Sequence, residues 1–139
     1  MMPIPRASVD TCFFLCYLTG APPDQAEQAE KILQQSERGE IQLVVPPLVI
    51  AEIIWVLETS VFNLSKQEAA EKAIAILNLR NIHVDNSRLL EEAAVLHAEL
   101  NIDYTNAYLA CFAKAEGLEN VYTFDKKDFS KVQWLRVLP

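Results

Sequence analysis

Residues 101–124, NIDYTNAYLACFAKAEGLENVYTF, decide the fold class that the sequence predicts. After a polar first turn the stretch is almost wholly apolar, as expected of a buried helix, and Gly117 is a typical residue just beyond a helical C-terminus. The run VYTF at 121–124 has the aromatic and β-branched composition of a short strand. A helix followed closely by a strand is the repeating pattern of an α/β protein.

The same alternation extends over the rest of the chain. Strand candidates occupy residues 6–10, 41–45, 82–84, 121–124 and 135–138. An apolar run follows the first strand at 11–18, and helix candidates occupy residues 23–39, 46–62, 65–79, 86–101 and 103–116. This order predicts a mostly parallel sheet with helices on both faces. We therefore expect an α/β fold, a three-layer α/β/α sandwich with a central five-stranded sheet.

Several helix starts carry local signals. Ser65 is followed three residues later by Glu68, the spacing of a capping box. Pro47 suits the first turn of its helix, and Asn86 or Ser87 is the expected cap of the helix that follows the third strand.

Composition limits the class of protein. The chain has 139 residues, of which 51% are hydrophobic, enough for one domain at residues 1–139 and too few for two. We expect no membrane span, because no apolar run approaches the roughly 18 residues that one needs, and no signal peptide is apparent. The expected location is cytoplasmic. A net charge of −7 is a poor overall field for nucleic acid, although basic residues gather near the C-terminus at Lys126, Lys127, Lys131 and Arg136.

Cysteine and histidine give no sign of a disulfide framework or a zinc site. Cys12, Cys16 and Cys111 are an odd number without CxxC spacing, and we interpret them as buried free thiols. His83 and His97 are distant from them in sequence, and His97 lies on or beside the apolar stripe of its helix, where a packing role is expected.

Three acids stand where an ordinary surface role does not explain them. Asp10 ends the first strand and Asp125 follows the fourth, so both lie at the carboxyl ends of strands, where α/β proteins bind ligands. Glu52 lies in LVIAEIIWVLE with apolar residues on every side. A carboxylate buried without partners costs several kcal/mol, so we expect a cation, a polar network or a crevice beside it. A structural ion pair or a narrow solvated stripe is the alternative.

The polar turn at the start of residues 103–116 has two interpretations. Asp103 suits an N-cap, which accounts for one polar residue of the turn. Asn106 lies three residues later, on the same face of the helix, so both side chains point toward the crevice. Oxygen ligands from Asp10, Glu52, Asp125 and this turn are what Mg²⁺ or Mn²⁺ prefers, and the matching chemistry is hydrolysis of a phosphodiester. No Ser-His-Asp or Cys-His set competes.

Four blocks of the sequence resemble the PIN domain family, and within it the VapC-like toxin ribonucleases of toxin–antitoxin pairs. The blocks are VDTCFFLCYLTG, PPLVIAEIIWVLE, IDYTNAYLACFAKAEG and VYTFDKKDF, in that order along nearly the whole chain. The resemblance implies that Asp10, Glu52, Asp103 and Asp125 have catalytic and metal-binding roles. It also implies that Thr11 and Asp128 are accessory residues. It also implies Mg²⁺ or Mn²⁺, an RNA substrate such as tRNA, a homodimer and an antitoxin.

Two residues depart from the family pattern. Asn106 stands where the third block normally has a metal-binding Asp, and Cys12 stands where the first block has Asn. Asn106 still offers a carbonyl oxygen as a metal ligand but removes one negative charge. A catalytically weakened PIN domain that acts in binding or dimerisation is therefore the alternative to an active ribonuclease.

Other classes fit less well. A receiver-like phosphoacceptor, with Asp10, Asp85 and Lys126, leaves Glu52 and Asp103 unexplained, and a haloacid-dehalogenase-like phosphatase needs an Asp at the position of Cys12. The helix at 23–39 and the aromatic residues Phe13, Phe14 and Tyr17 are candidates for subunit or antitoxin contacts, with core packing as the alternative.

Overall fold

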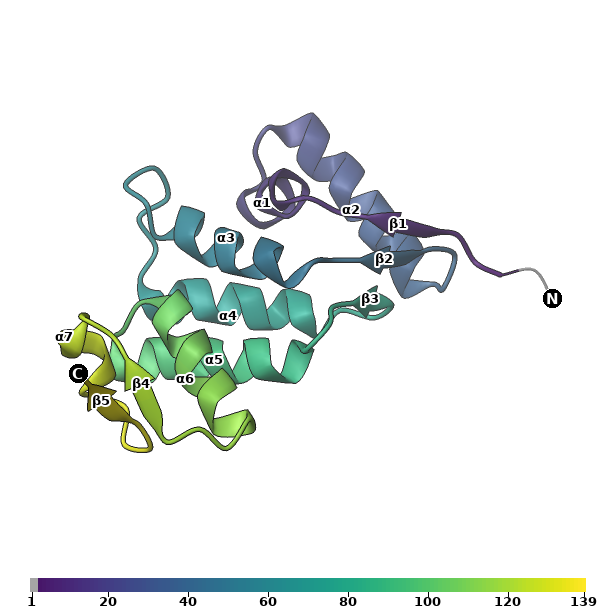
Figure 1. Cartoon of the computed structure of the whole chain (residues 1–139). Helices are drawn as coiled ribbons and strands as arrows, with labels where there is room; N and C mark the ends of the chain where they lie inside the picture. Colours follow the sequence, from purple (N-terminus) through teal and green to yellow (C-terminus); the bar gives the residue numbers. More distant parts are fainter. Residues whose placement is uncertain (1–2) are drawn as a thin grey trace.

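A computed structural model describes residues 3–139 (Figure 1). Strands and longer helices alternate as the sequence predicts. The strands are β1 (Arg6–Ser8), β2 (Gln42–Val44), β3 (Ile82–His83), β4 (Asn120–Tyr122) and β5 (Arg136–Leu138). The helices are α1 (Thr11–Thr19), α2 (Pro23–Glu37), α3 (Pro47–Leu57), α4 (Lys66–Leu77), α5 (Ser87–Leu100), α6 (Tyr104–Ala115) and α7 (Lys126–Phe129).

The strands form two separate parallel sheets. β1, β2 and β3 make one sheet in that order, with Ala7 opposite Leu43 and Leu43 opposite Ile82. β4 and β5 make the other, with Val121 opposite Val137. The expected single five-stranded sheet is therefore not observed in the described residues. Strand and helix alternation predicts that strands are parallel, but it does not determine which strand edges pair.

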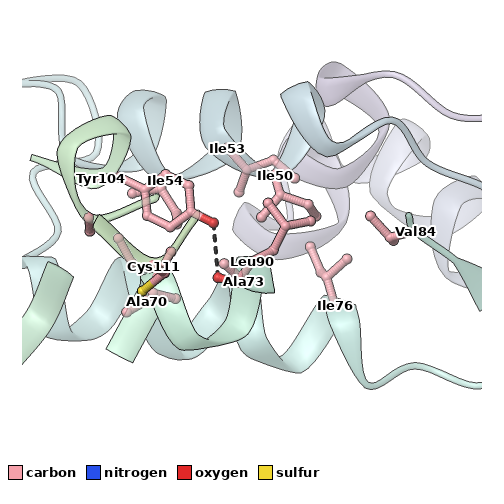
Figure 2. Packing of buried hydrophobic residues seen from close by; sticks show 14 of the residues in the cluster. Ile50, Ile53, Ile54, Ala70, Ala73, Ile76, Val84, Leu90, Tyr104 and Cys111 are labelled. Carbon is pink, nitrogen blue, oxygen red and sulfur yellow. Dashed lines mark hydrogen bonds between the residues drawn. The ribbon is translucent and has the colours of Figure 1, made fainter. Parts of the chain in front are cut away.

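A layer of consecutive helices, α3 to α6, holds most of the core (Figure 2). Ile50, Ile53 and Ile54 of α3 are fully buried. Each such side chain contributes about 1.5–3 kcal/mol through removal of apolar surface from water. The facing helices present small side chains that let the backbones approach closely, and the fully buried alanines are Ala69, Ala73, Ala93, Ala94, Ala107 and Ala110.

Local signals place several helix ends as predicted. The capping box is confirmed: Ser65 Oγ accepts from Glu68 N at 3.1 Å, and Glu68 Oε1 accepts from Ser65 N at 3.1 Å. Asn86 is the N-cap residue of α5, but its side chain makes no capping hydrogen bond. The apolar run after β1 forms α1, which ends at Gly20 in the left-handed conformation that glycine adopts readily.

A buried polar group lies inside the helical layer. The ring of His97, on α5, donates from Nδ1 to the Ile102 carbonyl oxygen at 2.5 Å, and its Nε2 lies 2.6 Å from Oε2 of Glu58. The ring meets Tyr104 edge-on, with 5.8 Å between centroids. The expected packing role of His97 is confirmed, and both ring nitrogens have partners.

The remaining apolar predictions are mostly confirmed. Phe14 is fully buried, and Phe13 and Tyr17 pack partly buried against the core. Cys16 and Cys111 are buried free thiols, but the expectation is wrong for Cys12, which is exposed on the first turn of α1. Within residues 3–139, no helix combines the length and the apolar character required to cross a membrane.

Candidate functional site

Polar side chains from α6, α7 and the end of β4 converge in one cluster. Nδ2 of Asn106 donates to Asp125 Oδ2 at 2.9 Å and to Asp128 Oδ2 at 3.0 Å. The same Asp128 oxygen accepts from the backbone N–H of Asp103 at 3.0 Å. We call Asp103, Asn106, Asp125 and Asp128 the α6–α7 cluster.

Capping positions two members of this cluster. Asp103 is the N-cap of α6, with Oδ2 accepting from Thr105 N at 3.1 Å, as the sequence predicts. Asp125 is the N-cap of the short helix α7, with Oδ1 accepting from Asp128 N at 3.2 Å. Thr123 Oγ accepts from Asp125 N at 2.9 Å and so fixes the turn after β4. In each of these two carboxylates, one oxygen takes no part in the capping hydrogen bond.

Asn106 takes the place between the two carboxylates. Both of its partners are acceptors, so the NH₂ group and not the carbonyl oxygen faces them. Its amide thereby offsets the repulsion between Asp125 and Asp128 with two donors and no formal charge. A carboxylate at position 106 would add a third negative group at the same point, and only a cation would make that arrangement favourable.

The pKa of Asp128 lies below its usual value. Burial is the largest influence and would raise this pKa, but it is outweighed by the hydrogen bonds from Asp103 N–H and Asn106 and by the positive charges of Lys131 and Lys127. Asp128 therefore stays ionised at neutral pH and holds the start of α6 to α7. Its central position was not expected, since the sequence indicated only an accessory role.

Asp10 and Thr11 lie in another part of the molecule, at the junction of β1 and α1. Asp10 is exposed and caps α1, its Oδ1 accepting from Phe13 N at 3.0 Å. Thr11 is buried, and no hydrogen bond joins its hydroxyl to Asp10 among the described contacts. A hollow of about 590 Å³ opens beside Asp10, along β1 and β2.

Glu52 is exposed on α3, which contradicts the expectation that it lacks a solvated face. Its neighbours one turn away are also exposed, Leu48 by 74% and Trp55 by 68%. The opposite face of α3 packs into the core through Ile50, Ile53 and Ile54. The pattern misled because apolar residues occur on both faces of this helix, although only one face is covered.

A single chain does not assemble the predicted metal ligands. Among residues 3–139, no three His, Cys, Asp or Glu side chains are placed to hold a metal ion together. β1 and α1 lie on the opposite side of the helical layer from α7 (Figure 1), so Asp10 does not reach the α6–α7 cluster. The donor atoms are of the right chemistry for Mg²⁺ or Mn²⁺, but their arrangement within one chain does not fit either ion.

One residue that supports the α6–α7 cluster, Thr123, was not predicted from the sequence. Thr123 fixes the backbone of Asp125 and lies just beyond β4, in the run 121–124 that the sequence predicts as a strand. Its signal is local: a Thr two residues before an Asp at a strand end forms a turn of the kind that hydroxyl side chains favour.

Comparisons with known proteins identify the family. The PIN domain model matches residues 7–135, and the chain therefore belongs to the PIN domain family. Among solved structures, VapBC2 from Rickettsia felis, bound to a DNA fragment from its promoter, aligns with 16% identity and a TM-score of 0.38. That alignment covers 96% of this chain and 97% of the other. A search of curated protein sequences found no match.

Proposed function

We propose that this chain is a ribonuclease that hydrolyses RNA phosphodiester bonds with a divalent cation, Mg²⁺ or Mn²⁺. Membership of the PIN domain family over residues 7–135 carries the proposal, because PIN domains are generally metal-dependent nucleases. The acids at the strand ends support it: Asp10 lies just beyond β1, and Asp125 lies just beyond β4. Ligands of α/β proteins bind at this end of parallel strands.

The surroundings of the α6–α7 cluster suit a phosphate backbone. Lys126 and Lys127 are exposed on α7, directly after Asp125, and Lys131 follows that helix. Lys131 Nζ lies 3.3 Å from the Asn101 carbonyl oxygen, close to the start of α6. Lysines beside a carboxylate cluster can hold phosphates of a single strand near the acids, although the protein as a whole is acidic.

The wider proposal is a cytoplasmic toxin of the VapC type, with RNA such as tRNA as its substrate, a homodimeric state and an antitoxin partner. Its support is the resemblance of four sequence blocks in order. Asp10, Glu52, Asp103 and Asp125 remain the proposed catalytic residues, Thr11 and Asp128 remain accessory, and Asn106 remains a proposed ligand. Because the ligands are not assembled within one chain, we assign no catalytic step to them here.

A second candidate function is a binding or dimerisation protein with a weakened site. The contacts of Asn106 favour it. Its amide donates to both Asp125 and Asp128, so Oδ2 of each carboxylate has a hydrogen-bond partner without a cation. On this interpretation the cluster is a structural clamp between α6 and α7.

Calorimetric titration with Mn²⁺, together with an RNA cleavage assay, separates the two functions. For the ribonuclease we expect Mn²⁺ binding and metal-dependent cleavage in the wild type, and loss of both in Asp125→Asn. Glu99→Gln, which removes an exposed carboxylate on α5, is the matched control and leaves both intact.

Asn106 variants provide the contrary outcome. If the wild type does not bind Mn²⁺ or cleave RNA but Asn106→Asp does, the binding function is supported and the ribonuclease proposal fails. Asn106→Ala removes the amide without adding charge, so a gain in Asn106→Asp alone shows that the added charge is responsible.

A further inference from the structure

The two faces of the β4–β5 sheet differ. Val121 and Val137 lie opposite each other and pack against the core. Side chains alternate between the faces of a strand, so the neighbours of these valines point to the other face. That second face, which we call the outer face, carries Asn120, Tyr122, Arg136 and Leu138. Tyr122 is 80% exposed, which shows that the described residues leave the outer face open to solvent.

A second exposed aromatic ring follows Tyr122 along the chain. Thr123 N donates to Leu138 O at 2.8 Å, so the extended pairing continues one residue beyond β4. Phe124 comes next and is 91% exposed. Residues two apart in an extended segment are separated by about 7 Å along the strand. Two rings therefore lie in succession on the surface, directly before Asp125, a proposed catalytic residue.

The same end of the chain is basic. Residues 118–139 have four basic and three acidic residues, whereas the preceding 117 residues have eight basic and sixteen acidic ones. The net charge is therefore +1 in this segment and −8 in the rest of the chain. Lys126 and Lys127 are exposed on α7, and Arg136 is exposed on the outer face. Positive charge is thus concentrated beside the two rings in a protein that is otherwise acidic.

A hollow of about 560 Å³ extends this surface past Arg136. Lys114 and Trp134 also line it, with Lys114 Nζ 4.7 Å from the centroid of the Trp134 ring. Glu119 is an acid of the same lining. Cations and aromatic rings therefore occur together on both sides of Arg136, as they do along the grooves that bind single-stranded nucleic acid.

We propose that an unpaired segment of RNA binds across the outer face, with two successive bases stacked on Tyr122 and Phe124 and its phosphates beside the lysines of α7. Every base has an aromatic face, so stacking on these rings accepts any sequence. The bases of a duplex are already stacked on one another and cannot stack on the rings, whereas unpaired bases can be splayed out. The surface therefore selects unpaired over paired RNA and leads the strand to Asp125. The choice of RNA as occupant rests on the proposed ribonuclease function.

The composition of the surface favours RNA over a protein partner. Lysine is depleted in protein–protein interfaces, whereas rings beside cations are typical of single-strand binding sites. The exposed face of α3 provides the contrast. Leu48 and Trp55 are exposed there, but α3 contains no basic residue and Glu52 lies between them. Exposed apolar side chains occur on both surfaces, and only the outer face combines them with positive charge that a phosphate backbone requires.

Binding of a short, fluorescently labelled single-stranded RNA, followed by fluorescence anisotropy in EDTA, tests the surface without cleavage. We expect Tyr122→Ala and Phe124→Ala each to weaken binding at least about fivefold, the smallest loss expected for one stacked base. Tyr122→Phe keeps the ring and therefore the affinity. Trp55→Ala removes a ring of 68% exposure from α3 and leaves the affinity unchanged. Because the substituted rings are exposed, circular dichroism of all variants is expected to match the wild type.

Salt dependence separates the lysines from the rings. Lys126→Gln/Lys127→Gln is expected to lower the slope of log Kd against log salt concentration by at least about 0.7, the contribution of one phosphate contact on a single strand. Phe124→Ala leaves the slope unchanged, because stacking releases no counterions. Lys31→Gln/Arg88→Gln, which removes two exposed charges from α2 and α5, is the matched control. An unchanged slope in the α7 variant overturns the placement of the phosphates.

Three results overturn the proposal as a whole. The first is equal affinity of the wild type and both alanine variants, and the second is equal affinity for the single strand and its duplex. The third is a Tyr122→Ala variant with a changed mass in light scattering but unchanged RNA affinity, which assigns the outer face to a protein partner.

A cleavage assay with Mn²⁺ keeps this proposal distinct from the proposed function. Binding that depends on the two rings, without metal-dependent cleavage, supports the surface and contradicts the ribonuclease. Metal-dependent cleavage of single-stranded RNA that neither Tyr122→Ala nor Phe124→Ala slows, with unchanged binding, contradicts the surface and leaves the ribonuclease in place.

Discussion

Two polar groups of this protein use similar contacts in opposite surroundings. The His97–Glu58 pair lies inside the helical layer, where the His97 side chain is 2% exposed and that of Glu58 19%. The α6–α7 cluster lies at the surface, and Asp103 and Asp125 are exposed. Both groups join segments distant in sequence, through bonds of 2.6 Å in the first and 2.9–3.0 Å in the second.

The difference shows that burial decides whether a polar group contributes strongly to stability or stays accessible to ligands. Loss of a partner inside the layer leaves a buried polar atom that water cannot reach, which costs the full desolvation free energy. At the surface, water replaces a lost partner, so the cluster contributes less to stability but is accessible to a cation or a phosphate. A buried network fixes the fold, and an accessible one is available for ligands.

The largest expected change in the free energy of unfolding follows substitution of the buried His97–Glu58 pair. His97→Ala leaves the Ile102 carbonyl without its partner, leaves Glu58 with only Lys66, 3.6 Å away, and creates a cavity beside Tyr104. We expect the free energy of unfolding to fall by about 3 kcal/mol. Urea denaturation followed by circular dichroism measures it. His83→Ala is the matched control, because His83 is half exposed, and we expect a change below about 0.5 kcal/mol. Equal losses of unfolding free energy in the two variants would contradict the expected dependence on burial.

A smaller effect is expected within the same layer. The Tyr104 hydroxyl donates to the Leu90 carbonyl oxygen at 3.0 Å (Figure 2), and burial raises the pKa of this hydroxyl well above its usual value. Tyr104→Phe removes that bond while keeping the ring, so we expect a loss of about 1 kcal/mol in unfolding free energy. Tyr108→Phe, which removes a partly buried hydroxyl from the same helix, is the control. A neutral Tyr104→Phe variant would show that this bond adds no net stability.

The smallest effect concerns the surface cluster and depends on pH. The pKa of Asp128 is below its ordinary value of 3.8 in the folded protein, so the stability it contributes is present above that value and is lost as pH falls through the folded pKa. Between pH 5 and pH 2 we expect the wild type to lose more stability than Asp128→Asn, by less than about 1 kcal/mol because the group is partly solvated. Thermal unfolding across this range measures the difference. Parallel curves for the two proteins would contradict the assigned role of Asp128.

Local features of the fold were predictable from sequence because their causes are local. The capping box at Ser65 and Glu68, the cap at Asp103 and the alternation of strands with helices all depend on residues within a few positions of one another. The packing of His97 was likewise visible in the stripe of its helix.

Features that depend on distant surfaces were not predictable. Glu52 was expected to lack solvent because its neighbours are apolar, yet no residue in the described range 3–139 covers Leu48 and Trp55 on that face. The division into sheets of three and two strands depends on which edges meet, and no local pattern encodes that choice. The acids lie just beyond β1 and β4 as predicted, but the predicted cluster of Asp10 with Asp125 is not observed, because β1 and β4 belong to separate sheets.

The order of elements in the helical layer also bears on how fast the chain folds. α4, α5 and α6 follow one another in sequence and each packs on the next, so their contacts close short loops. β1 instead meets β2 through residues 36 positions apart, as the Arg6–Gln42 hydrogen bond shows. Chains rich in local contacts fold faster than those that depend on distant pairing. We therefore expect the α4–α6 layer to form within the folding nucleus and the strands to join it afterwards, so that substitutions in the layer slow folding while those in the strands speed unfolding.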